Sequence, residues 1–166
     1  MRALFLLTVL IAMPIYAQQA SSKSGSANLS ADQKQAIRNV LSSQSKVDSR
    51  YIDSDNGHFV DELGFSSIPL SNESVILVEY PSSTQGHNSA FWLFDLRSGA
   101  PHLIGSPDNK LAGFWEDIIL PHTSYGFHDF VLGWGGPPGA QSETTFRYDG
   151  HGYRAIRTHK VEFVDK

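Results

Sequence analysis

The chain has 166 residues, with 13 Lys plus Arg, 17 Asp plus Glu and no Cys, so its formal net charge is −4 with histidine neutral. This length suits one ordinary domain, and the lack of cysteine excludes a disulfide scaffold, thiol catalysis, cysteine-based metal sites and a lipid-modified N-terminal cysteine. The mildly acidic balance argues against nucleic acid as a partner, because phosphate binding depends on clustered Lys and Arg.

The first 17 residues have the pattern of a secretory signal peptide. Arg2 supplies the positive charge, residues 3–13 are apolar, and Ala17 fits a cleavage point before Gln18. The apolar run is shorter than the roughly 20 residues that cross a bilayer. We therefore expect a periplasmic or secreted protein with no integral membrane span once the leader is removed.

The rest of the chain is expected to form a tether followed by one domain. Residues 18–29 are small and polar. They have too few apolar side chains to offset the entropy lost on ordering, which predicts a disordered tether. Residues 30–166 then make a single domain.

One helix is predicted at the start of this domain. Ser30 and Gln33 form a capping-box pattern that favours a helix over residues 31–44. Because an isolated helix of this length is marginal in water, its apolar stripe predicts docking on one face of a sheet. The stripe consists of Ile37, Val40 and Leu41.

Short runs of β-branched and aromatic residues, separated by Gly, Pro, Asn and Ser, follow residue 50 and predict strands. The continuous apolar run 75–78 predicts a central strand covered on both faces, with the N-terminal helix as one cover. Residues 149–152, DGHG, mark the clearest hairpin turn. The expected strands lie near residues 51–53, 58–63, 74–80, 90–96, 101–105, 114–120, 127–134, 143–149 and 152–164.

The predicted fold class is therefore α+β, mainly β. We expect a twisted antiparallel sheet of about seven to nine short strands, with one N-terminal amphipathic helix packed on it. No repeat of 20 to 50 residues is present in the chain, which argues against a solenoid or a propeller of several blades.

Two motifs in the C-terminal half carry a resemblance. Residues 126–131, GFHDFV, are followed by residues 145–150, TFRYDG, and then by Tyr153. This pattern, G-aromatic-x-D-hydrophobic and then aromatic-x-aromatic-D-G-x-x-Y, resembles one of small exported bacterial proteins of unknown function, and distantly a single FG-GAP unit. The resemblance covers about residues 60–155 and implies no activity. The FG-GAP calcium loop would correspond to residues 68–74, which lack its aspartates and glycines.

The densest polar cluster consists of His122, His128 and Asp129. In an extended strand His128 and Asp129 point to opposite faces, which argues against a shared metal ion unless a bulge intervenes. His122 and His128 flank a turn and could converge, but a catalytic zinc ion takes three protein ligands. We therefore expect no metal and no cofactor, and we expect Asp129 to accept backbone N–H groups at the Gly126 turn.

Residues 133–139, GWGGPPG, form the best candidate recognition loop. Trp134 sits between glycines, and the Pro-Pro pair limits the freedom of the loop, so the large amphipathic ring would bind at low entropic cost. The alternative is that Trp134 folds back into the core. Trp115, in an aromatic run, and Tyr125, beside the predicted turn, complete the set of candidate binding residues.

These observations favour an exported non-enzymatic binding module that recognises a protein or glycan of the cell envelope, with inhibitor-like and envelope-associated roles both open. Its loops at one end of the sheet are the expected contact surface. The alternative is a small periplasmic hydrolase that uses His122, His128 and Asp129, with or without a metal, although no G-x-S-x-G or S-x-x-K motif is present. Seven histidines exceed the net negative charge, so solubility or partner binding should vary between about pH 5 and 7.

Overall fold

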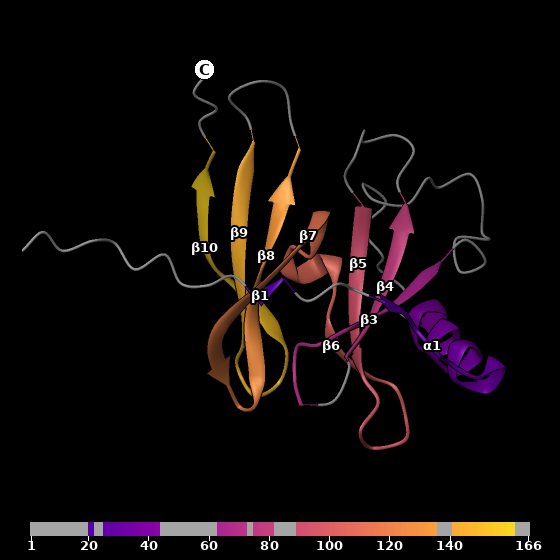
Figure 1. The fold of residues 1–166 in the computed structure, drawn as a ribbon. Helices are drawn as coiled ribbons and strands as arrows, with labels where there is room; N and C mark the ends of the chain where they lie inside the picture. The colour runs from indigo at the N-terminus through magenta and orange to yellow at the C-terminus, as the bar shows by residue number, and fades with distance from the viewer. Residues whose placement is uncertain are drawn as a thin grey trace, which may run out of the picture.

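The computed structural model describes residues 20–21, 25–43, 63–72, 75–81, 89–135 and 141–161 (Figure 1). These residues form one α-helix, one short 3-10 helix and ten strands in an antiparallel sheet that does not close into a barrel, which confirms the predicted class. The strand order is β10-β9-β8-β7-β5-β4-β3-β2, with β1 beside β7 and β6 beside β5.

The elements have the following bounds. The helices are α1 (Ala31–Ser43) and η2 (Pro107–Asn109). The strands are β1 (Ala20–Ser21), β2 (Gly25–Ser26), β3 (Gly64–Ile68), β4 (Val75–Pro81), β5 (Ser89–Asp95), β6 (His102–Gly105), β7 (Ala112–Ser124), β8 (Phe127–Trp134), β9 (Ser142–Tyr148) and β10 (Tyr153–Lys160).

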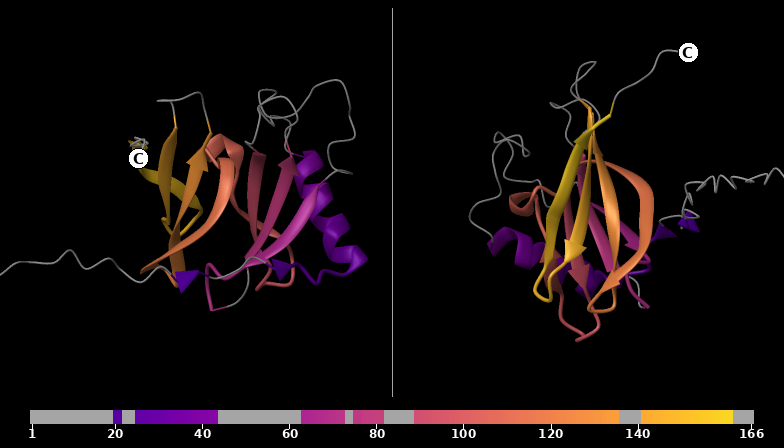
Figure 2. Two further views of the ribbon diagram at one scale, coloured as in Figure 1. Left: turned by 45° about the horizontal axis from the view of Figure 1, so that its top comes forward. Right: turned by 90° about the vertical axis from the view of Figure 1, so that its left-hand side faces the viewer.

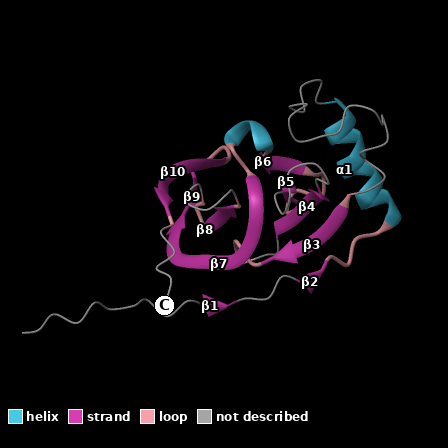
Figure 3. Ribbon diagram, turned by 90° about the horizontal axis from the view of Figure 1, so that it is seen from above, coloured by secondary structure: helices cyan, strands magenta, loops and turns pink. Residues whose placement is uncertain are grey.

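Strand β7 joins two halves of the sheet. It starts beside β5, where Ala112 and Gly113 pair with Ala90 and Ser89, and from Phe114 onward it pairs with β8. We call the two parts the β7–β10 half and the β3–β6 half. Seen from above, they lie side by side, with α1 beyond β3 and β4 (Figure 3).

The main core lies between the two halves. Its buried side chains come from both of them, and five of its six aromatic members are in the β7–β10 half. Phe130 and Phe146 stack with their ring centroids 5.1 Å apart, and Tyr153 meets Phe130 edge-on at 4.9 Å. The remaining members are Ile68, Leu70, Val75, Leu77, Phe91, Leu93, Ile104, Leu111, Ile119, Phe127, Leu132 and Tyr148.

Helix α1 covers the outer face of the β3–β6 half, as predicted. The capping box forms, because the Gln33 N–H donates to Ser30 Oγ and the Ser30 N–H donates to Gln33 Oε1. Ile37 and Leu41 are fully buried, and Val40 packs beside them. Residues 75–78 form the predicted central strand: Val75 and Leu77 enter the main core, whereas Ile76 and Val78 lie under the helix with Trp92 and Phe94.

The expectation of a disordered tether at residues 18–29 is wrong for the part of it that the structure describes. β1 pairs with β7, β2 pairs with β3, and Ala27 is buried under α1. Strand pairing at a sheet edge uses backbone N–H and C=O groups, so this segment needs few apolar side chains to join the sheet. The predicted leader, residues 1–17, lies outside the described residues.

One further strand prediction differs from the structure, and two others fall almost entirely on residues that the structure does not describe. The expected strands 51–53 and 58–63 lie outside the described residues, apart from Leu63, and the strand before β4 is at Gly64–Ile68. β7 continues to Ser124 rather than ending near residue 120. In the described part of the chain, no helix is long and apolar enough to cross a membrane.

Replacing Gly113 with alanine should destabilise the protein. Gly113 has a φ of 136°, and a Cβ there would overlap the Gly133 carbonyl oxygen, which is backbone and cannot rotate away. We expect G113A to lower the free energy of unfolding by about 3 kcal/mol, measured by urea denaturation. G25A is the control, because a Cβ at Gly25 meets nothing within 4 Å. Equal stability of G113A and the wild type would contradict this account of the junction.

Candidate functional site

The hairpin between β7 and β8 ends in an exposed aromatic ring. Ser124 pairs with Phe127, so Tyr125 and Gly126 form a two-residue turn with φ values of 53° and 80°. Positive φ at both positions is what a type I′ turn requires. The Tyr125 side chain is 75% exposed, and its ring lies over Gly150 and meets Tyr148 edge-on at 6.3 Å.

A buried carboxylate lies close to this turn. Asp129 is 1% exposed, yet it belongs to the face of β8 that points away from the main core, opposite to Phe130. Arg147 donates from Nε to both carboxylate oxygens, at 3.2 and 3.1 Å, and from Nη2 to Oδ2 at 2.8 Å. His122 Nδ1 lies 3.1 Å from Oδ2. Two cationic or potentially cationic groups therefore fix one carboxylate.

Strand register explains how these three side chains meet. Phe130 pairs with Phe146, so the preceding residue of β8, Asp129, falls opposite Arg147 on β9. On the other side, β7 has an irregularity between Ile119 and Thr123 that places His122 beside Asp129. The hydrogen bond with Asp129 raises the pKa of the Arg147 guanidinium.

Two more arginines extend this surface onto β10. Arg154 pairs directly with Arg147, and Arg157, after a bulge, pairs with Thr145 on the same face. We call Arg147, Arg154 and Arg157 the arginine face. Figures 1 and 2 place α1 beside β3 and β4, far from β8–β10, so α1 does not cover the arginine face (Figure 2). Directly opposed like charges are unfavourable in a sheet, so this arrangement costs stability.

Asp149 anchors Arg154 and also builds the predicted turn at residues 149–152. Its Oδ1 accepts the N–H groups of His151 and Gly152, both at 3.0 Å, and its Oδ2 accepts Arg154 Nε. The Arg154 hydrogen bond, together with these two backbone N–H groups, lowers the pKa of Asp149 to about 2. The terminal nitrogens of Arg154 have no hydrogen-bond partner among the described residues.

A small cleft opens beside Arg154. It has a volume of about 140 Å³ and lies where the β9–β10 turn meets β6 and η2. Gly152 approaches the Ile104 carbonyl so closely that a Cβ there would be 3.1 Å from the oxygen. The cleft is lined by Leu103, Ile104, Gly105, Ser106, Asn109, His151, Gly152 and Arg154.

The histidine cluster forms only in part. His122 reaches Asp129, but the His128 ring lies elsewhere, with Nδ1 3.0 Å from the Leu120 carbonyl oxygen. The expectation that Asp129 accepts backbone N–H groups at the Gly126 turn is wrong, because the guanidinium of Arg147 occupies the carboxylate. Among the described residues, no group of three or more His, Asp or Glu is placed to hold a metal ion.

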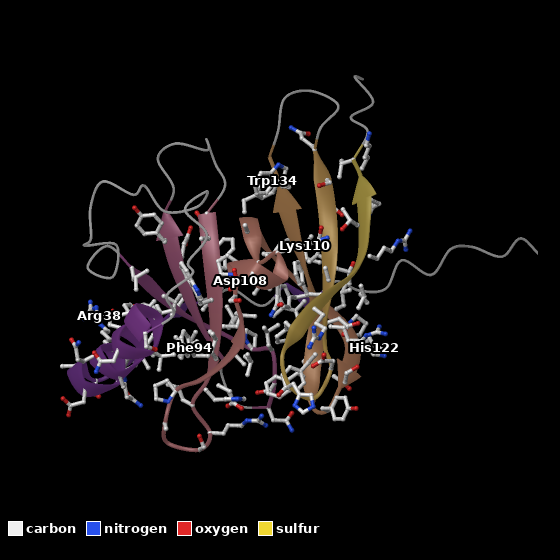
Figure 4. The ribbon with its side chains drawn as sticks, turned by 180° about the vertical axis from the view of Figure 1, so that it is seen from behind. Arg38, Phe94, Asp108, Lys110, His122 and Trp134 are labelled. Atoms are coloured by element: carbon white, nitrogen blue, oxygen red, sulfur yellow. The ribbon has the colours of Figure 1, made fainter. Side chains whose placement is uncertain are left out.

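The predicted binding residues do not come together. Tyr125 is at the β7–β8 turn, whereas Trp134 is half-buried at the other end of β8, about 30 Å away along the strand. Figure 4 shows that His122 also lies well away from Trp134. The backbone of Trp115 pairs with Leu132, but its side chain and the loop 136–140 lie outside the described residues. The idea of one recognition surface that includes both Trp134 and Tyr125 is therefore incorrect.

The arginine face was not predicted from the sequence, although the sequence contains a signal for it. Arg147 lies between Phe146 and Tyr148, which point inward, and Arg154 follows the inward Tyr153. A hairpin folded about residues 149–152 puts these two arginines opposite each other on the outer face. Arg157 was not predictable in this way, because the bulge in β10 changes its register.

Comparison with known proteins gives no match: no protein-family model, curated protein or solved structure is similar to this chain. The residues of the two C-terminal motifs nevertheless have clear structural roles. Phe146, Tyr148 and Tyr153 fill the main core, and the Tyr153 hydroxyl donates to the His128 carbonyl at 2.8 Å. Burial raises the pKa of Tyr153, so this hydroxyl keeps its proton and its hydrogen bond.

The lowered pKa of Asp149 predicts an acid-sensitive turn. A carboxyl group whose pKa is lower in the folded than in the unfolded state stabilises the protein above about pH 4, and this contribution is lost as the pH falls towards 2. We expect D149N to lose less of its melting temperature between pH 4 and pH 2 than the wild type does. Asparagine keeps an oxygen that accepts the two backbone N–H groups. Parallel melting curves for the two proteins over this range would argue against the role of the carboxylate.

Proposed function

We propose that this protein is an exported, non-enzymatic binding module, and that it recognises a glycan of the cell envelope through the Tyr125 end of the β7–β10 half. Tyr125, His122, Arg147 and Arg154 form the contact surface. The Tyr125 turn is the observation that carries the proposal. Export rests on the leader expected at residues 1–17.

Tyr125 occupies a position that favours a different residue. Type I′ turns prefer Asn-Gly or Asp-Gly, because the first central residue must adopt a positive φ. An L-residue with a Cβ has a penalty of about 1 kcal/mol in this conformation. The Tyr125 ring does not offset that cost by burial, since 75% of the side chain is exposed. A strained backbone that presents an exposed aromatic ring is typical of a binding position.

The surroundings of Tyr125 favour a polar ligand over a protein surface. Protein interfaces usually centre on a desolvated group of aromatic and aliphatic side chains. Among the described residues, the large hydrophobic side chains that are exposed are Tyr125 and Ile156, and Ile156 is on the bulge of β10. One exposed ring at the same end of the sheet as several guanidinium and imidazole donors matches a sugar, which offers a C–H face and many hydroxyl groups.

We expect Y125N to separate binding from stability. Asparagine suits the turn, so the variant should unfold at the same temperature as the wild type or at a higher one. Its free energy of unfolding should increase by up to about 1 kcal/mol. Removing the exposed ring should weaken binding at least about tenfold, since such aromatic anchors contribute about 2 kcal/mol. The measurements are thermal melting and retention of the full chain on an array of immobilised polysaccharides.

The same array tests the location of the surface. W134A changes the ring at the far end of β8 and should retain the polysaccharides that the wild type binds. If W134A loses binding and Y125N keeps it, the binding surface lies at the Trp134 end of the sheet, and the location proposed here is wrong. If the wild type binds no polysaccharide on the array, the glycan-binding function is wrong.

One observation favours the alternative of a small hydrolase. Asp129 orients His122 through Nδ1, at 3.1 Å, and the His122 side chain is 53% exposed, so its Nε2 can reach a substrate as a general base. We expect the purified protein to hydrolyse p-nitrophenyl acetate no faster than its H122A variant does. A rate that is clearly higher for the wild type, and that increases with pH through the histidine range, would favour the hydrolase.

A further inference from the structure

We infer that the glycan bound at this surface carries acidic groups, carboxylate or sulfate, and that the arginine face and the adjoining cleft recognise them. This inference rests on the proposed glycan-binding function and specifies its ligand class. It depends on three observations: the free donors of the arginines, the local charge, and the polar lining of the cleft.

The arginine face offers guanidinium donors that the protein does not use. Arg147 directs Nε and Nη2 to Asp129, and Arg154 directs Nε to Asp149, so Nη1 of both residues is left without a hydrogen-bond partner among the described residues. Arg157 is exposed, and no hydrogen bond or ion pair to its side chain exists in the described part of the chain. Guanidinium groups bind carboxylate and sulfate oxygens with paired N–H donors.

The charge of this surface is less negative than that of the whole chain. Two of the three guanidinium groups are paired with carboxylates, Arg147 with Asp129 and Arg154 with Asp149, and no ion pair of Arg157 exists among the described residues. In the next row of the same face, Glu143 is 3.2 Å from His159. The formal net charge of the chain is −4. With Glu143 counted, three guanidinium groups face three carboxylates, so this surface is formally neutral with histidine uncharged, and an anionic ligand meets less repulsion here than on the acidic remainder of the chain.

The cleft beside Arg154 has room for one acidic group. Its volume of about 140 Å³ is several times the roughly 30 Å³ that one water molecule occupies. Ser106, Asn109, His151 and Arg154 are among its lining residues, so residues that carry hydroxyl, amide, imidazole and guanidinium groups border the space. Arg154 belongs both to the cleft and to the arginine face, which makes the two parts continuous.

The experiment compares dextran sulfate with dextran, which share a sugar backbone and differ in charge. We expect the full chain to bind dextran sulfate at least about tenfold more tightly than dextran, measured by isothermal titration calorimetry in 50 mM and 300 mM NaCl, with weaker binding at the higher salt concentration. R157Q should weaken binding of dextran sulfate about tenfold, because it removes an exposed charge that no described residue pairs.

A matched variant controls for net charge. K34Q also removes one positive charge, but Lys34 is on α1 over the Phe65 ring, on the other half of the protein. We expect K34Q to bind dextran sulfate as the wild type does. Equal weakening by K34Q and R157Q would overturn the inference, because binding would then follow net charge alone.

Three other results would also count against the inference, and they differ in what they imply for the proposed function. Equal affinity for dextran and dextran sulfate, lost in Y125N, would leave the glycan-binding function in place and remove the acidic ligand. Tighter binding of polyglutamate than of dextran sulfate would indicate that the ligand is an acidic polypeptide. Both the glycan-binding function and the acidic glycan would then be wrong. If the wild type binds neither polysaccharide and also fails on the polysaccharide array, the proposed function itself fails.

Discussion

The close approach of Gly113 to the Gly133 carbonyl is the constraint on which the two-part sheet depends. It occurs where β7 leaves β5 and begins to pair with β8, and there is no room for a Cβ at that point. Because β7 pairs with strands of both halves, the inner faces of the two halves share one core. Aromatic residues of β8, β9 and β10 fill this core together with apolar residues of β4 and β5. The junction also leaves each half with an outer face, and the two outer faces differ in polarity and in what covers them.

The outer face of the β3–β6 half is apolar and is covered by α1, whereas the arginine face of the β7–β10 half is polar. On the polar face the carboxylate of Asp129 is buried beneath the side chains that it fixes, Arg147 and His122. A buried carboxylate is tolerated only when it is paired and hydrogen-bonded, so Arg147 cannot leave Asp129 without a large cost. The result is a guanidinium group held in one orientation, with part of its donor edge free for a ligand.

The Tyr125 turn and the opposed arginines both lower the stability of the fold at the same end of the sheet. A tyrosine in a left-handed conformation costs backbone energy, and Arg147 directly opposite Arg154 costs electrostatic energy. Asp129 and Asp149 offset the second cost, whereas the first is offset only by the edge-on contact of the exposed Tyr125 ring with Tyr148 among the described residues. Natural sequences depart from local preferences mainly at functional sites, which is why this end of the sheet supports a binding role better than the Trp134 end does.

The sequence by itself determined the features that depend on neighbours along the chain: the Ser30 cap, the stripe of Ile37 and Leu41, the doubly covered strand at residues 75–78, and the turn at residues 149–152. Local periodicity and turn chemistry encode these directly. Tertiary structure alone decided that His122 meets Asp129, that Arg157 joins the arginine face, and that Tyr125 and Trp134 lie apart. The irregularities in β7 and β10 shift strand register, and no pattern of period two reveals where a strand is displaced.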